Sequence, residues 1–123
     1  MLRVGVDMIE VERIRQAMER HGERFFARFF TGVEREQARN APARLAARFA
    51  AKEAVAKALG TGIGEVCWVD IEVWLDEAGR PHLRLYHEAA ARAAEMGLDD
   101  WQVSLSHTNE AAIAFVVASG SGQ

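Results

Sequence analysis

The sequence predicts an α+β fold in which a largely antiparallel sheet packs against one long, buried central helix. The helix is expected at residues 45–59, where alanine dominates and nearly every residue is a good helix former. Residues 66–76 alternate strictly between apolar and polar side chains, as a strand of a half-buried sheet does. A short turn separates this segment from a second strand expected at residues 82–86, which favours antiparallel pairing.

Length and composition indicate a single folded domain, which we place at residues 1–118. The chain has 123 residues, of which 50% are hydrophobic and 27% are charged, as in a globular protein. Residues 119–123 are mostly serine and glycine, and we expect them to form a flexible tail. No apolar run is long enough for a membrane helix, and residues 1–4 do not resemble a signal peptide. The single cysteine, Cys67, excludes an internal disulfide and favours a cytoplasmic location.

The charged residues are unevenly distributed along the chain. Residues 1–57 hold 12 basic and 8 acidic residues, whereas residues 58–123 hold 3 basic and 10 acidic residues. The overall net charge of −3 argues against general nucleic-acid binding. An anionic ligand or partner is therefore expected to meet the first half of the chain.

The first expected element is a strand at residues 2–9, with its even-numbered apolar residues on one face. Asp7 lies on the other face with Gly5. An acidic residue near the end of an apolar strand is unusual, because aspartate is depleted in strands. Asp7 therefore either caps the next helix or has a functional role.

Residues 10–30 are expected to form a helix that is broken near Gly22. Its core-facing stripe consists of Val11, Ile14, Met18, Phe25 and Phe29. Arg13, Arg20 and Arg24 share another line of the helix, apart from the acidic residues. This grouping suggests docking to an acidic surface. The alternative is a solvated face with local ion pairs.

A short helix is expected to begin after Thr31, which forms a plausible capping box with Glu34. Residues 40–42 then form a loop before the central helix. Small or apolar side chains cover both sides of residues 45–59, so this helix is predicted to be buried on most of its circumference. Gly60 follows it as a C-terminal cap with positive φ.

Four charged residues remain on the central helix, and a largely buried charge needs a partner. Their spacing is i, i+4 in each pair, Arg48 with Lys52 and Glu53 with Lys57. One interpretation is two ordinary surface strips, with Glu53 and Lys57 as a helix ion pair. The other is that these charges serve a site. The glycine-rich loop at residues 60–64 could bring backbone N–H groups to a phosphate, although it is no P-loop.

The alternation of residues 66–76 places Cys67 on the apolar face, so we expect it in the core and not as a nucleophile. Trp68 and Trp74 fall on the polar face, which suggests a subunit contact. A turn at residues 76–81 leads into the returning strand.

The last part of the chain is expected to hold a helix at residues 87–96, ended by Gly97, and two strands at residues 101–105 and 111–118. The final strand is apolar on both faces. His107 continues the parity of the apolar residues in the preceding strand. It is therefore either a core or hairpin-end histidine or a functional one; a lone histidine is no metal site.

These segments together resemble the small bacterial 4′-phosphopantetheinyl transferases, the holo-[acyl-carrier-protein] synthases. Three segments carry the resemblance, namely VGVDMIEVERI at residues 4–14, RFAAKEAVAKALGTG at residues 48–62 and SLSHT at residues 104–108. FTGVE at residues 30–34 matches a fourth motif. The match runs in order from end to end of the chain, and the central signature is highly specific.

The resemblance implies transfer of 4′-phosphopantetheine from coenzyme A to a serine of apo acyl carrier protein, with adenosine 3′,5′-bisphosphate as the second product. It implies that Asp7 and Glu53 hold Mg²⁺ against the pyrophosphate, a role suited to hard carboxylate oxygens. Glu53, or a water molecule beside it, would take the serine proton. Lys57 would offset phosphate charge or assist the leaving group.

The remaining implied contacts surround these catalytic residues. Substrate-binding residues at the nucleotide end would be Arg48, Gly60, Thr61, Gly62, His107 and Thr108. Arg13, Arg20 and Arg24 would dock the acidic carrier protein. The resemblance also implies a homotrimer with active sites at the subunit interfaces, so that Glu53 and His107 of one site come from different chains.

Two other classes of function remain open from the residues alone. One is a non-catalytic module that binds coenzyme A or a nucleotide; loss of Asp7 or Glu53 would favour it, and both are present. The other is a Mg²⁺-dependent diphosphate hydrolase, which would use water as the nucleophile and would not need the arginine face.

Overall fold

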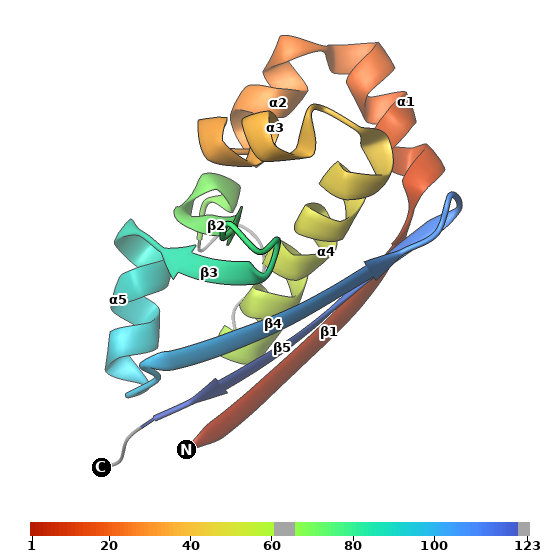
Figure 1. Ribbon diagram of the computed structural model, residues 1–123. Coiled ribbons are helices and arrows are strands. Elements are labelled where there is room, and N and C mark those ends of the chain that lie inside the picture. Colours follow the sequence, from red (N-terminus) through yellow and green to blue (C-terminus); the bar gives the residue numbers. More distant parts are fainter. Residues whose placement is uncertain (61–65, 121–123) are drawn as a thin grey trace.

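The computed structural model of the chain describes residues 1–60 and 66–120 (Figure 1). Its strands and helices follow one another as β1 (Leu2–Glu10), α1 (Val11–His21), α2 (Glu23–Phe29), α3 (Gly32–Ala38), α4 (Pro42–Leu59), the 3-10 helix η1 (Trp68–Asp70), β2 (Ile71–Leu75), β3 (Pro81–Leu85), α5 (His87–Glu95), β4 (Asp100–His107) and β5 (Ala111–Ser119).

The α+β architecture expected from the sequence is confirmed. Strands β1, β5 and β4 form one antiparallel sheet in that spatial order, and β2 pairs with β3 in a separate antiparallel hairpin. Figure 1 shows α4 running across one face of the three-stranded sheet, with α1–α3 grouped at one end and α5 beside the hairpin. The core therefore lies around α4.

Helix α4 is buried on most sides, as its alanine-rich sequence predicts. Pro42 occupies its first turn, where its missing N–H costs no hydrogen bond, and Gly60 ends it with a φ of 72°. The backbone of β1 approaches the helix so closely at Gly5 that a Cβ there would lie 1.9 Å from the carbonyl oxygen of Ala54. Only glycine permits this contact between sheet and helix.

The expected helix break at Gly22 is also confirmed, because this residue separates α1 from α2 with a φ of 52°. Phe25 and Phe30 then enter the core from α2 and its end. The predicted capping box is present: Thr31 accepts from the N–H of Glu34, and Glu34 accepts from the N–H of Thr31. These local signals set the positions of three short helices around the first half of α4.

The outer face of the sheet, on the side away from α4, exposes a set of large apolar side chains. Their exposed fractions run from 40% to 68%, and they come from β1 and β5, namely Leu2, Val4, Val6, Met8, Ile113 and Phe115. The alternate residues of β5 are buried against the helix, so the prediction of a last strand that is apolar on both faces holds.

The strand expected at residues 66–76 is wrong in its first half. Residues Trp68–Asp70 form η1, and β2 begins only at Ile71. The turn shifts the alternation, so Cys67 is exposed and not in the core. Trp68 is buried against Phe49 and cannot serve the subunit contact expected of it.

The expectation of a flexible tail at residues 119–123 is wrong for its first two residues. Ser119 belongs to β5 and pairs with Leu2 and Asp100, and the N–H of Gly120 donates to the carbonyl of Met1. Residues 121–123 lie outside the described residues. None of the described helices combines the length and the apolar character needed to cross a membrane.

We expect Gly5→Ala to lower the free energy of unfolding by about 3 kcal/mol or more, because the added methyl group overlaps the backbone of α4. Gly32→Ala is the matched control, since a Cβ there meets nothing within 4 Å. Chemical denaturation of both variants measures the difference. Equal stability of the two variants would contradict the close packing of β1 on α4.

Candidate functional site

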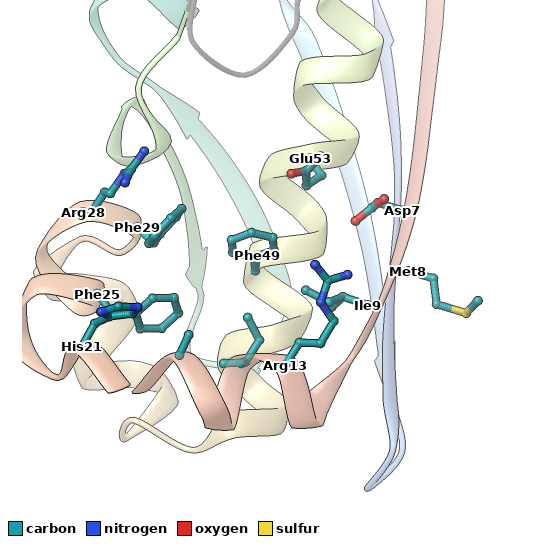
Figure 2. A pocket seen from close by; sticks show the side chains of 12 residues that line it. Asp7, Met8, Ile9, Arg13, His21, Phe25, Arg28, Phe29, Phe49 and Glu53 are labelled. Atoms are coloured by element: carbon teal, nitrogen blue, oxygen red, sulfur yellow. The ribbon is translucent and has the colours of Figure 1, made fainter. Parts of the chain in front are cut away.

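A pocket of about 540 Å³ opens between β1, α1, α2 and α4. Figure 2 shows its lining, in which Asp7 extends from β1, Arg13 from α1 and Glu53 from α4. The side chain of Met8 points to the other side of the sheet in this view. The pocket, called here the carboxylate pocket, thus gathers three of the residues that the sequence singled out.

The two carboxylates occupy the pocket because of the elements that carry them. Asp7 has the same strand parity as Gly5, so it faces α4 from the point where β1 lies close to the helix. Partial burial, and then the nearby negative charge of Asp7, raise the pKa of Glu53, while Lys57 acts in the opposite direction. A carboxylate pair that holds one member toward its protonated form is suited to bind a cation.

Lys57 lies one helical turn beyond Glu53 and contacts Asp7 instead of forming the simple helix pair. Its ammonium donates to the carbonyl of Val6 at 2.9 Å and to Asp7 Oδ1 at 3.2 Å. The lysine is more than half exposed, so its charge remains accessible to a ligand. Asp7, Glu53 and Lys57 therefore form one group, as expected from the sequence.

Aromatic side chains form the wall of the carboxylate pocket on the side of α2 and α4. Phe25 and Phe29 come from α2, and Phe49 lies one turn before Glu53 (Figure 2). His21 and Arg28 add polar groups to the same rim. The sequence predicted a core position for Phe25 and Phe29 and gave no role to His21, although the clustering of aromatic residues after Gly22 was a usable signal.

Arg48 and His107 lie in a second pocket of about 280 Å³, called here the arginine pocket. It is formed by α3, the start of α4 and the ends of β2 and β4, and Arg44 and Ser106 also line it. The two pockets have no lining residue in common. Within one chain, the structure therefore does not bring Arg48 and His107 to the two carboxylates.

Arg48 is only 3% exposed, yet its guanidinium is incompletely paired. Nη1 donates to the carbonyl of Arg44 at 3.0 Å. Nε and Nη2 are buried without a hydrogen-bond partner in the described part of the chain. Burial lowers the pKa of Arg48, Glu34 opposes this effect, and Arg44 adds to it. Unsatisfied buried donors are costly, so this arginine is suited to receive an anion.

The other predicted residues are placed as follows. Gly60 caps α4, and Thr61 and Gly62 lie outside the described residues. Thr108 is exposed at the β4–β5 turn, where its Oγ1 accepts from the N–H of Ala111. Arg20 is exposed on α1, and Arg24 lines a smaller pocket of about 210 Å³ on α2 that shares His21, Phe25, Arg28 and Phe29 with the carboxylate pocket.

The donor set of the carboxylate pocket fits a hard divalent cation that a substrate helps to bind. In residues 1–60 and 66–120, no three His, Cys, Asp or Glu side chains form a complete metal site. Two carboxylates leave positions for phosphate oxygens and water, which is how Mg²⁺ is commonly bound. The arrangement is therefore suited to chemistry on a phosphate ester or anhydride.

Known proteins are similar to this chain in sequence and in fold. The holo-[acyl-carrier-protein] synthase of Herpetosiphon aurantiacus is 51% identical over 127 residues, which cover 98% of this chain and all of the relative. The solved holo-[acyl-carrier-protein] synthase of Helicobacter pylori, in complex with coenzyme A, superimposes with a TM-score of 0.86 at 30% identity. That match covers 94% of this chain and 99% of the other.

A second solved structure is the holo-(acyl-carrier-protein) synthase of Bacillus anthracis, in complex with CoA (3′,5′-ADP). It is 37% identical with a TM-score of 0.79, and the match covers 97% of this chain and 96% of the other. The sequence profile of the 4′-phosphopantetheinyl transferase superfamily matches residues 3–116. This range includes both pockets. The chain belongs to the 4′-phosphopantetheinyl transferase superfamily.

Proposed function

We propose that the protein transfers the 4′-phosphopantetheine group of coenzyme A to a serine of an apo acyl carrier protein, and that adenosine 3′,5′-bisphosphate is released. The observation that carries this proposal is the pair of carboxylates, Asp7 and Glu53, that share one pocket with Lys57 beside them. Relatives with 30% or more identity along nearly the whole chain include structures in complex with coenzyme A.

Asp7 and Glu53 are the residues that would hold Mg²⁺ in the carboxylate pocket. The cation, when bound, supplies neutralisation of charge on the pyrophosphate. Lys57 is placed to share this task, because it is exposed and directed at Asp7. Cleavage of a phosphoanhydride depends mainly on such positioning and charge compensation.

In the transfer step, the serine oxygen forms a bond to the phosphorus of the phosphopantetheine group while the anhydride bond to the nucleotide phosphate breaks. Glu53, or a water molecule beside it, accepts the serine proton. The raised pKa of Glu53 brings this carboxyl nearer to the range in which it can accept a proton at neutral pH. The nucleotide phosphate leaves with the bonding electron pair.

The nucleotide end of coenzyme A is assigned to the arginine pocket. Arg48 carries two buried donors that have no partner among residues 1–60 and 66–120, and His107 lines the same pocket. Gly60, Thr61, Gly62 and Thr108 are assigned to the same end of the substrate through the resemblance of their motifs. Phosphate oxygens at Arg48 would satisfy donors that the folded chain leaves open.

Arg13, Arg20 and Arg24 are assigned to docking of the acidic carrier protein. The ion pairs of the described α1 and α2 residues use other arginines, since Glu12 pairs with Arg15 and Glu23 with Arg35. Arg13 also lines the carboxylate pocket, so a docked carrier would lie next to the reacting group. A cytoplasmic location is part of this proposal, and the single cysteine of the chain supports it.

The active enzyme is proposed to be a homotrimer with its sites at the subunit interfaces. The outer face of the sheet exposes a continuous apolar surface on β1 and β5, which is typical of a face that another chain covers. The carboxylate pocket and the arginine pocket share no lining residue, which supports a site that takes each of them from a different chain. Glu53 and His107 of one site then belong to neighbouring subunits.

The mass of a purified apo carrier protein, incubated with coenzyme A, Mg²⁺ and enzyme, tests the function. We expect Glu53→Gln and Asp7→Asn to slow the gain in mass by about 100-fold or more, because each removes a carboxylate that would hold the cation whose charge neutralises the pyrophosphate. Glu88→Gln is the control, because it removes a carboxylate at an exposed position of α5, and it should leave the rate unchanged. Near-normal rates in both pocket variants at limiting Mg²⁺ would reject the assignment, and hydrolysis of coenzyme A without carrier modification would indicate a hydrolase.

The shared site predicts complementation between two inactive variants. When equal amounts of Glu53→Gln and His107→Ala chains are refolded together, about one quarter of the interfaces in random trimers should receive both intact groups. We therefore expect activity to return to roughly that fraction of wild type. If mixed trimers form and remain inactive, or if the wild type is active as a monomer, the shared site is wrong.

A further inference from the structure

A buried ion pair joins α3 to α4 behind the aromatic wall of the carboxylate pocket. Lys52 Nζ lies 2.8 Å from Glu34 Oε1, and neither side chain has any exposed surface. The ammonium also donates to the carbonyl of Trp68 at 3.0 Å and to the carbonyl of Ile71. The three N–H groups of Lys52 thus have three acceptors. Two of these acceptors, the carbonyls of Trp68 and Ile71, attach η1 and the residue after it to the central helix.

Glu34 is held equally firmly on the other side of the pair. Its Oε1 accepts from the N–H of Thr31 at 2.9 Å, and its Oε2 accepts from the N–H of Val73 at 2.8 Å. Burial lowers the pKa of Lys52, whereas Glu34 favours its charged form. The pair therefore links α3, α4 and β2 through directional bonds.

The contact that matters for the pocket is the one to Trp68. The Trp68 indole stacks on Phe49, with ring centroids 4.7 Å apart and planes inclined by 22°. It also packs on Phe29 at 5.1 Å, and Phe29 and Phe49 themselves are 5.5 Å apart. Both phenylalanines line the carboxylate pocket together with Glu53 (Figure 2). A shift of Trp68 therefore has to move the wall opposite the carboxylates.

A contribution to stability does not by itself explain why the buried position between α3 and α4 holds the charged pair Glu34 and Lys52. Well-packed apolar residues can often replace a buried ion pair without loss of stability, because removing two charges from water is costly. What the pair supplies is direction: Glu34 and the Ile71 carbonyl hold the ammonium in place, and its remaining hydrogen bond fixes the position of the Trp68 carbonyl. A displacement of a substrate-facing wall by about 1 Å can cost on the order of 100-fold in rate.

We propose that Glu34 and Lys52 are positioning residues for the transfer reaction, which hold Trp68 and thereby set Phe29 and Phe49 against the substrate. This inference rests on the proposed function of the carboxylate pocket. Neither residue touches the substrate in this arrangement; they act through Trp68.

Steady-state kinetics test the proposal in three variants, Lys52→Met, Trp68→Leu and the double variant. Each rate is measured below the unfolding midpoint of its variant and divided by the concentration of folded enzyme. We expect each single variant to lower kcat/KM for coenzyme A by about tenfold or more. The double variant should be little worse than the worse single one, because both changes disturb the same wall. Tyr86→Phe is the matched control, since it removes a 2.9 Å hydrogen bond to buried Glu72 in the β2–β3 hairpin, and it should leave kcat/KM unchanged.

A spectroscopic readout separates positioning from general loss of structure. In a Trp74→Phe/Trp101→Phe background, Trp68 is the remaining tryptophan, and Lys52→Met should shift its emission while Tyr86→Phe should not. Additive kinetic effects of the two changes would overturn the proposal. Wild-type kcat/KM in Trp68→Leu would overturn it even if Lys52→Met fails to fold. If the wild type does not modify a carrier protein, the proposed function fails, whereas the emission of Trp68 still reports whether Lys52 positions it.

Discussion

A helix that is buried on nearly all sides, but carries four charged residues beyond its first turn, constrains the whole structure. Each of these charges must find a partner within the protein or face a site, because an isolated buried charge is strongly unfavourable. Lys52 finds Glu34 and two carbonyls. Glu53 and Lys57 lie beside Asp7 at the edge of a pocket, and two donors of Arg48 have no partner within the part of the chain that the structure describes. The distribution of charge on α4 therefore decides which parts of the molecule are structural and which can bind phosphate.

The two faces of the sheet differ in what they contact. The inner face packs against α4, whereas the outer face exposes apolar side chains. Its inner face carries small residues such as Gly5, Ala112 and Ala114, which let α4 approach the strands closely. Its outer face exposes large side chains such as Val6 and Phe115. The same close approach brings Asp7 to the helix, so the packing that stabilises the core also assembles the carboxylate pair.

Much of this could be predicted from the sequence because the signals are local. Helix propensity, the glycine at position 60 and the Thr31–Glu34 capping box depend on neighbouring residues. The strand predicted at residues 66–76 was wrong in its first half, where Lys52, distant in sequence, donates to the carbonyls of Trp68 in η1 and of Ile71 directly after it. The wall of Phe29 and Phe49 could not be distinguished from core, since apolar periodicity does not reveal which buried rings border a pocket. The roles proposed for Asp7 and Glu53 rest on the resemblance of their motifs, since spacing alone left these roles open.

The central claim is that charges left without a full set of partners on the buried helix bind the substrate, and Arg48 tests it most directly. Calorimetric titration should compare coenzyme A with dephospho-coenzyme A, which lacks the 3′-phosphate, in the wild type and in Arg48→Met. We expect the wild type to bind coenzyme A about tenfold or more tightly than dephospho-coenzyme A, since charge-assisted hydrogen bonds are strong. Arg48→Met should lose this preference while its affinity for dephospho-coenzyme A stays nearly unchanged. An equal preference in both proteins would contradict the account.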